Sequence, residues 1–408
     1  MSSDASFDLN VEGLYQAIDW LGCQDYSALP RYDLPNALPD AGLGEAQALD
    51  QLAPDILGLA TYLDAGDALA HMDPPTPWIS WAVALWTARL NQNLLHPATA
   101  PFARDAEARV VQWLVPFFGM NGGHMTAGSS LANLTALWAA RDLRGVKTVV
   151  ASTACHLSIR KAAQILGLGF VEAGIDPGHR LDPATLPHDL SEACLVLTAG
   201  TTSIGAVDPL DCCGRAAWTH IDAAWAGPLA LSDRYRSTLA GIERADSVSV
   251  SAHKWLFQPK ESALVMFRDT EAANRAISFG GAYLAAPNIG VQGSHGAAGT
   301  LLLATLLAWG RQGMAARIEK CMQNASRLQA FIAAQPDLEA FPDGATGLIV
   351  FRPTSRRVDA FFAALPQGLA SLTTINADKW LRCVCANPNA DMDRIIGAID
   401  ETRRRIGP

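Results

Sequence analysis

Apolar and polar residues alternate along the chain in a way that predicts strands and helices in turn. Short apolar or β-branched runs predict strands at Val146–Ala151, Ala193–Leu197, Ala216–Ile221, Ser247–Val250 and Ala263–Phe267. Segments with helical spacing lie before and between them, at Pro77–Leu95, Leu131–Arg144, Ser158–Leu166 and Asp182–Leu190. This alternation predicts an α/β fold in which a mostly parallel central sheet is flanked by helices.

The same pattern divides the chain into three parts. Residues 1–75 combine short helical patterns with many prolines, which predicts an N-terminal arm or lid. Residues 76–300 contain the predicted sheet and form the expected large domain. Residues 301–408 predict a long connecting helix and a small C-terminal α/β domain. The elements expected in that small domain are the strands Gly347–Phe351 and Trp380–Cys385 and the helices Val358–Leu365 and Met392–Ile406.

Composition narrows the class of protein. Half of the 408 residues are hydrophobic and 17% are charged, which is typical of a globular chain. The net charge of −9, without a block of Lys or Arg, argues against a nucleic-acid partner. No signal-peptide pattern and no apolar run of membrane-spanning length is seen, so we expect no membrane partner. Eight scattered cysteines without facing CxxC pairs predict no metal site and a cytoplasmic protein with reduced thiols.

Two polar clusters that follow predicted strands contain groups suited to an aromatic cofactor. Lys254, in the run Ser251–Trp255, comes directly after a strand, and a Schiff base would make its amine part of a cofactor. Asp222 ends another apolar strand, where its carboxylate could keep a pyridine nitrogen protonated, and the small Ala224 follows two residues later. The ordinary alternatives are a surface lysine at a strand end and an aspartate that caps the next segment.

A third cluster could bind a phosphate through a glycine and two hydroxyl groups at the start of a predicted helix. These residues are Gly128, Ser129 and Ser130. Free N–H groups and the helix dipole favour an anion at this position, and Ser251 and His253 supply further donors beside Lys254. The alternative is an ordinary serine N-cap.

Two more clusters follow predicted strands. His156, in the segment Ser152–Ser158, could stack on a cofactor ring and move protons. Thr201 and Thr202, in the segment Thr198–Asp208, could bond the phenolic oxygen of the ring. The alternative for His156 is a loop histidine bonded to the backbone, and the alternative for Thr198–Asp208 is a polar turn. Because ligands of parallel sheets lie at the carboxyl ends of the strands, all five clusters are expected to meet at one place.

Taken together, these segments resemble the group II amino-acid decarboxylases, which depend on pyridoxal 5'-phosphate (PLP) and have fold type I of the aspartate-aminotransferase superfamily. The resemblance extends from about His71 to Pro388. The matching segments are His71-Met72, Leu90–Asn93, Gly128–Asn133, His156–Ser158, Gly200–Thr202, His220–Ala224, Ala245–Ser247, Ser251–Trp255, Tyr283-Leu284, Trp309-Gly310, Leu381-Arg382 and Asn387-Pro388.

The resemblance implies a role for each matching residue. It implies that Lys254 forms the Schiff base with PLP and that Asp222 pairs with the pyridine nitrogen. Ala224 and His156 would pack on opposite faces of the ring. Further cofactor-binding positions are Gly128, Ser129, Ser130, Thr201, Thr202, Ser251, His253 and, across a dimer interface, Ser294. Substrate-binding positions are Arg382, for the α-carboxylate of an amino acid, His71 and Asn91. Members of the family are homodimers with shared active sites, so a homodimer is expected here.

Two features depart from the family pattern. Ser294-His295-Gly296 stands where many members have Ser-Arg, so a cation near the site is replaced by a titratable group. The loop Ala285–Gly293 is short and lacks the tyrosine that reprotonates the α-carbon in animal aromatic-amino-acid decarboxylases. The group that donates this proton is therefore left open.

Three functions are compatible with these residues. The first is α-decarboxylation of an L-amino acid to an amine and CO2, through the Lys254 Schiff base and a quinonoid intermediate. The second is another PLP reaction on the same scaffold, either a carbon–carbon lyase acting on a 2-amino-alcohol phosphate or a decarboxylation-dependent oxidative deamination. The third is a non-catalytic binding protein, which the presence of Lys254, Asp222 and His156 disfavours. The sequence leaves the side chain of the substrate undetermined.

Overall fold

The computed structural model describes residues 6, 8–23, 26, 29–282, 284, 287–342 and 345–407. The chain forms two compact units, residues 1–62 and 63–408. The first unit contains the helices α1 (Val11–Leu21) and α2 (Glu45–Gly58). The second unit contains the three sheets formed by the described residues and all of the predicted site residues. No helix among the described residues is both long and apolar enough to span a bilayer.

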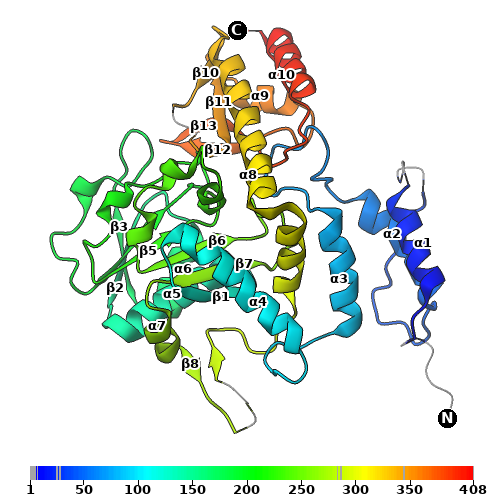
Figure 1. The fold of residues 1–408 in the computed structure, drawn as a ribbon. Helices are drawn as coiled ribbons and strands as arrows, with labels where there is room; N and C mark the ends of the chain where they lie inside the picture. Colours follow the sequence, from blue (N-terminus) through cyan, green and yellow to red (C-terminus); the bar gives the residue numbers. More distant parts are fainter. Residues whose placement is uncertain are drawn as a thin grey trace. The chain divides into compact units, whose positions relative to one another are not determined.

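A seven-stranded sheet forms the centre of the second unit (Figure 1). Its strands are β1 (Gly122–Thr126), β2 (Thr148–Ser152), β3 (Gly169–Ala173), β4 (Ala193–Thr198), β5 (Trp218–Asp222), β6 (Ser247–Ser251) and β7 (Ala263–Phe267). They are ordered β1-β7-β6-β5-β4-β2-β3, and only β7 runs against its neighbours. The predicted mostly parallel sheet is therefore confirmed.

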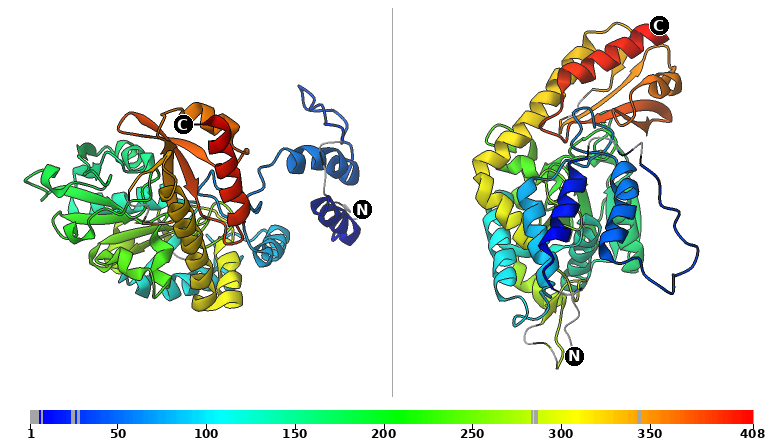
Figure 2. Two further views of the ribbon diagram at one scale, coloured as in Figure 1. Left: turned by 90° about the horizontal axis from the view of Figure 1, so that it is seen from above. Right: turned by 90° about the vertical axis from the view of Figure 1, so that its right-hand side faces the viewer.

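Alternate side chains of the strands enter two apolar layers on opposite faces of this sheet. The ribbon of the sheet and its helices is drawn from two further sides in Figure 2. Val150 and Leu195 lie in the layer that α4 and α8 cover, whereas Val149 and Cys194 lie in the layer of α5, α6 and α7. This period of two is what places one row of strand side chains against α5. The helices are α3 (Trp78–Leu90), α4 (Pro101–Leu114), α5 (Ser129–Arg144), α6 (Leu157–Ile165), α7 (Thr270–Ala276) and α8 (Ala298–Ala333).

Two features of the large sheet differ from the expectations. The predicted helix Asp182–Leu190 is wrong, because only a short 3-10 turn, Pro183–Thr185, forms there. Pro187 lacks the N–H group that a continuing helix needs, and its ring disfavours helical backbone before it. The strands β1 and β3 were not predicted, since β1 begins with two glycines and β3 is a partly exposed edge strand.

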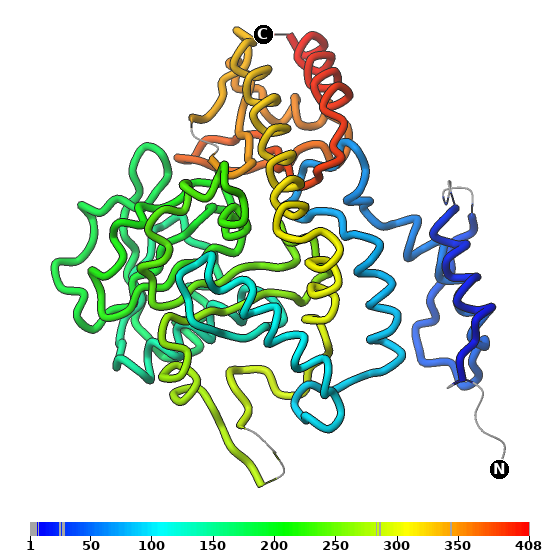
Figure 3. The backbone as a smooth tube through the Cα atoms, viewed as in Figure 1, coloured from blue at the N-terminus to red at the C-terminus, as the bar shows by residue number. Residues whose placement is uncertain are grey.

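A second, four-stranded antiparallel sheet lies near the C-terminus, with the order β10-β11-β13-β12. Figure 3 shows α8 running towards it; the backbone of this helix breaks at Gly310, where φ is 60°. The backbone N–H of Leu69 donates to the carbonyl of Gly368, so the chain that precedes α3 lies against this small sheet. The elements are β10 (Leu338–Ala340), β11 (Leu348–Pro353), β12 (Ser371–Ile375), β13 (Asp378–Val384), α9 (Val358–Ala364) and α10 (Met392–Ile406); a separate two-stranded pair is β8 (Ser278–Phe279) and β9 (Asn288–Ile289).

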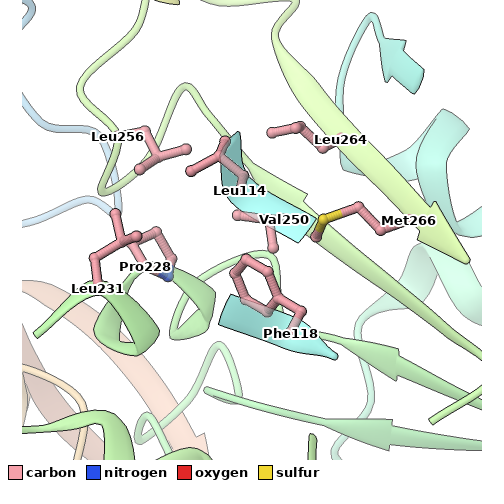
Figure 4. A pocket seen from close by; sticks show the side chains of 8 residues that line it. All are labelled: Leu114, Phe118, Pro228, Leu231, Val250, Leu256, Leu264 and Met266. Atoms are coloured by element: carbon pink, nitrogen blue, oxygen red, sulfur yellow. The ribbon is translucent and has the colours of Figure 1, made fainter. Parts of the chain in front are cut away.

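A small apolar pocket lies in the layer between the large sheet and α4 (Figure 4). Its lining consists of Leu114, Phe118, Pro228, Leu231, Val250, Leu256, Leu264 and Met266. All eight side chains are apolar, so this pocket is a packing defect of the core and offers no group for chemistry.

Candidate active site

The polar clusters predicted from the sequence meet at one edge of the large sheet. Thr126, Ser152, Thr198, Asp222 and Ser251 are the last residues of β1, β2, β4, β5 and β6. These five strands run in the same direction, so their carboxyl ends share one edge. That edge is the usual ligand site of an open α/β sheet.

The start of α5 forms one side of the site. Gly128 precedes the helix with φ of 112°, a backbone conformation that favours glycine. The hydroxyl of Ser129 hydrogen-bonds the hydroxyl of Ser251, and Ser251 Oγ lies 3.5 Å from His253 Nε2. Burial lowers the pKa of His253 to about 4, so its ring is neutral near pH 7. Ser130, by contrast, is exposed. The helix N-terminus, two hydroxyls and a neutral imidazole thus form a group of donors suited to an anion.

The carboxylate of Asp222 is buried and held by three neighbours. The backbone N–H of Ala224 donates to Oδ1 over 3.1 Å, and the Asn133 amide donates to Oδ2 over 3.0 Å. The hydroxyl of Ser249 lies 3.4 Å from Oδ1. These contacts fix the direction in which the carboxylate faces.

Asn133, on α5, uses both ends of its fully buried amide. An ionised carboxylate only accepts hydrogen bonds, so the amide nitrogen faces Asp222 and its oxygen accepts from Ser249 and His220. His220 therefore carries its proton on Nε2, and its Nδ1 accepts from Ser247 over 2.9 Å. Burial lowers the pKa of His220 to about 4, which agrees with a neutral ring.

A second branch of this network reaches His156. The Asn133 amide also donates to Ser158 Oγ over 3.0 Å, and Ser158 Oγ lies 2.8 Å from His156 Nδ1. The backbone N–H of Ser158 donates to the same Nδ1. His156 Nδ1 is thus an acceptor, which leaves the proton of the neutral ring on Nε2. Burial lowers the pKa of this histidine.

Lys254 follows β6 and is partly buried among these groups. Burial lowers the pKa of its amine, and the negative charge of Asp222 partly opposes that effect. Within the described part of the chain, its Nζ atom has no hydrogen bond or ion pair. A lowered pKa makes the neutral, nucleophilic form of the amine more available.

The remaining predicted positions have other partners in the structure. Thr201 Oγ1 accepts from the backbone N–H of Ala206, which closes a turn, and the side chain of Thr202 is exposed. Arg382 donates to the carbonyls of Thr202 and Ala70 and to Ser371 Oγ, and these three bonds use three of its five N–H groups.

Three more predicted residues are exposed. Ser294 Oγ accepts a hydrogen bond from Asn93 over 3.0 Å. Asn91 ends α3 with a left-handed backbone, and His71 precedes that helix. Tyr283, which contributed to the family resemblance, lies outside the described residues.

The comparisons with known proteins bear on this site. Residues 33–354 match the pyridoxal-dependent decarboxylase conserved domain. The chain is 30% identical to the L-2,4-diaminobutyrate decarboxylase of Rhizobium meliloti (strain 1021), over 90% of this chain and 84% of that protein. It is 26% identical to the aromatic-L-amino-acid decarboxylase of Bacillus atrophaeus, over 86% of this chain and 78% of that protein.

The chain belongs to the pyridoxal-dependent decarboxylase family. It is an enzyme of amino-acid decarboxylation, and its cofactor is PLP. The crystal structure of mouse CSAD has the same fold, with a TM-score of 0.84, 23% identity and coverage of 96% of this chain and 98% of that one. The sphingosine-1-phosphate lyase of Burkholderia pseudomallei shares the fold as well, with a TM-score of 0.81 over 94% of this chain and 95% of that one, at 19% identity.

The residues at the sheet edge fit PLP. Thr198 Oγ1, Ser152 Oγ and His253 Nδ1 are buried and find no hydrogen-bond partner among the described residues. Buried polar atoms without partners are unusual in folded proteins, and three of them at one ligand edge suit a polar cofactor. Asp222, the α5 N-terminus and Lys254 supply the carboxylate, the anion site and the amine that this cofactor needs.

Sequence reasoning missed the residues that connect the site. Asn133 and His220 lay within the motifs but received no role, and Ser158 and Ser249 were equally unassigned. One signal was present: in the run Ser247–Ser251 serine alternates with valine, which predicts a polar row on one face of β6. What the alternation could not show is that this row faces Asn133.

Proposed function

We propose that Lys254 binds PLP covalently and that the residues around it direct the decarboxylation of an L-amino acid. The observation that carries this proposal is the convergence of Lys254, Asp222 and the start of α5 on one edge of the sheet. When bound, PLP draws electrons from the α-carbon of the amino acid and so allows CO2 to leave.

Each residue has a proposed task. Asp222, oriented by Asn133, holds a proton at the ring nitrogen of the cofactor. Gly128, Ser129, Ser130, Ser251 and His253 bind the phosphate, and Thr201, Thr202 and Ser294 complete the cofactor site.

Ala224 would cover one face of the cofactor ring, and His156 would cover the opposite face. Because Nδ1 of His156 is occupied by Ser158, its Nε2–H is the group available to the substrate. Arg382 binds the α-carboxylate with its two further N–H groups, and His71 and Asn91 border the substrate.

A single substitution tests the core of this proposal. Lys254→Ala should abolish both the visible absorption of bound PLP and the release of CO2, because the amine that attaches the cofactor is gone. Lys320→Ala, which changes an exposed lysine of α8, serves as the matched control. Uptake of PLP by the Lys254→Ala protein with unchanged CO2 release would overturn the proposal, and so would release of an aldehyde with oxygen consumption by the wild-type enzyme.

We further propose a homodimer with shared active sites. Helix α3 exposes a cluster of large apolar side chains, and such a cluster commonly marks a protein–protein interface. Its members are Trp78, Trp81, Leu85, Trp86 and Leu90. Sedimentation should give the mass of two chains for the wild type, and Trp81→Glu should yield monomers with reduced activity. A fully active wild-type monomer would contradict the proposal.

The organisation and location of the chain are also proposals. Residues 1–75 form the N-terminal arm, residues 76–300 the PLP-binding domain and residues 301–408 the smaller domain. The four-stranded sheet has an apolar core of its own, which supports a separate small domain. We also propose a cytoplasmic location. The seven cysteines from Cys155 to Cys385 are free thiols, which is typical of proteins in that reducing compartment.

A further inference from the structure

A charged pair borders the site beside Lys254 and has no role in the reaction described so far. The ammonium of Lys260 forms an ion pair with the carboxylate of Asp73. Lys260 lies in the loop between β6 and β7, six residues after Lys254. Asp73 lies in the segment that connects the small sheet to α3.

Asp73 is held in place by its own segment. The carbonyl of Leu69 accepts from the backbone N–H of Val384, and the carbonyl of Ala70 accepts from Arg382. The next residue after Asp73 is the buried Pro74, whose ring restricts the backbone. The segment that carries Asp73 is therefore fixed against β13, the strand of Arg382, which is the proposed ligand of the substrate carboxylate.

The two charges of the pair have different neighbours. Asp73 raises the pKa of the Lys254 amine and has a larger effect on it than Lys260, which lowers that pKa. At His253, Lys260 is the charged group with the largest effect. Both charges of the pair thus act on ionisable groups of the site, Lys254 and His253.

The two side chains also differ in exposure. The Lys260 side chain is 60% exposed and that of Asp73 36%. An exposed ion pair contributes little to stability, so Lys260 can leave Asp73 at low cost. A second ammonium group that takes its position would restore the same interaction with the carboxylate.

We propose that Asp73 binds the ammonium group of the substrate's side chain and that Lys260 occupies this position in the empty enzyme. The preferred substrates are then short L-amino acids with a second amine, since the α-amine would take the place of the Lys254 amine on the cofactor and leave the side-chain ammonium for Asp73. A substrate with a carboxylate side chain would be repelled by the negative charge of Asp73. This inference rests on the proposed decarboxylase function and adds the class of substrate.

The test measures kcat/KM for CO2 release from L-2,4-diaminobutyrate, L-ornithine, L-aspartate and the uncharged L-norvaline. In Asp73→Asn, kcat/KM for the two diamino acids should fall by about tenfold or more, while that for norvaline stays within about twofold. Lys260→Met should leave the diamino-acid values unchanged or raise them, because the competing ammonium is gone. Asp359→Asn removes the carboxylate of a remote exposed pair with Lys379 and is the matched control.

A binding measurement separates this inference from the proposed function. Calorimetry on the PLP-loaded enzyme should show tighter binding of 1,3-diaminopropane than of propylamine, and Asp73→Asn should abolish that difference. If no amino acid loses CO2, the proposed function fails. The difference in binding between 1,3-diaminopropane and propylamine then still tests the role of Asp73 independently. The inference is overturned if wild type prefers aspartate or norvaline, or if Asp73→Asn affects all ligands equally.

Discussion

The amide of Asn133 donates a 3.0 Å hydrogen bond to the carboxylate of Asp222, and so links the first turns of α5 to the end of β5. The same amide serves Ser158, His220 and Ser249. One asparagine thereby orients the carboxylate proposed to face the cofactor nitrogen and, through Ser158, the imidazole of His156. Its loss should affect both groups at once.

Replacement of this asparagine tests that connection. Asn133→Ala should lower the free energy of unfolding by about 1–3 kcal/mol, because His220 and Ser249 lose a buried partner. It should also weaken PLP binding, since Asp222 loses an orienting donor. Urea unfolding and PLP titration measure the two effects. Asn324→Ala removes another buried asparagine, one whose Nδ2 has no partner among the described residues, and should leave PLP affinity unchanged. Wild-type PLP affinity in Asn133→Ala would refute the link.

The guanidinium of Arg382 joins three segments and is proposed to bind the substrate. Arg382→Lys keeps the charge but loses the planar fork, so we expect KM to rise about tenfold or more with a smaller change in kcat. Steady-state kinetics of CO2 release measure this split. Arg327→Lys, at an exposed ion pair with Asp393, is the control. A loss of stability without a change in KM would assign Arg382 a purely structural role.

Asp208 predicts a pH dependence of stability. This buried carboxyl accepts from the backbone N–H groups of Thr198 and Leu181, yet burial raises its pKa to about 6. The unfolded chain ionises it at lower pH than the folded chain does, so its contribution to stability falls as the pH rises between about 4 and 6.

The variant Asp208→Asn cannot ionise and should not show this dependence. The free energy of unfolding of the variant minus that of the wild type should increase by about 3 kcal/mol from about pH 4 to about pH 7. Urea unfolding at several pH values gives the difference directly. A difference that stays constant with pH would show that Asp208 titrates normally.

The apolar pocket of Figure 4 predicts a change in stability alone. Leu264 lines it and is fully buried, so Leu264→Ala should lower the free energy of unfolding by about 2–5 kcal/mol by enlarging a cavity. Leu372→Ala, at a 40% exposed position, should change it by less than about 1 kcal/mol. Both variants should still bind PLP, and loss of binding in Leu264→Ala would connect this pocket to the site.

Local patterns in the sequence determined much of the fold. The strands β4, β6 and β7 formed within one residue of their predicted bounds, and α10 formed at its predicted bounds. The reason is that β4 and β7 are apolar runs, β6 alternates serine with valine, and α10 has a regular helical stripe. The pattern failed at Asp182–Leu190, where the apolar spacing was helical but Pro187 prevented a helix. It also missed β1 and β3, whose strand conformation depends on neighbours in the sheet.

By itself, the sequence placed Lys254 and Asp222 after predicted strands, and therefore at one edge of the sheet, and it identified the α5 start as a candidate anion site. Only the tertiary structure decided which partners these residues meet. Asn133 and Asp222 are 89 positions apart, and Asp73 and Lys260 are 187 apart, so no local periodicity relates them. Such pairs form because the tertiary fold brings distant segments together, and burial then strengthens the hydrogen bond between Asn133 and Asp222.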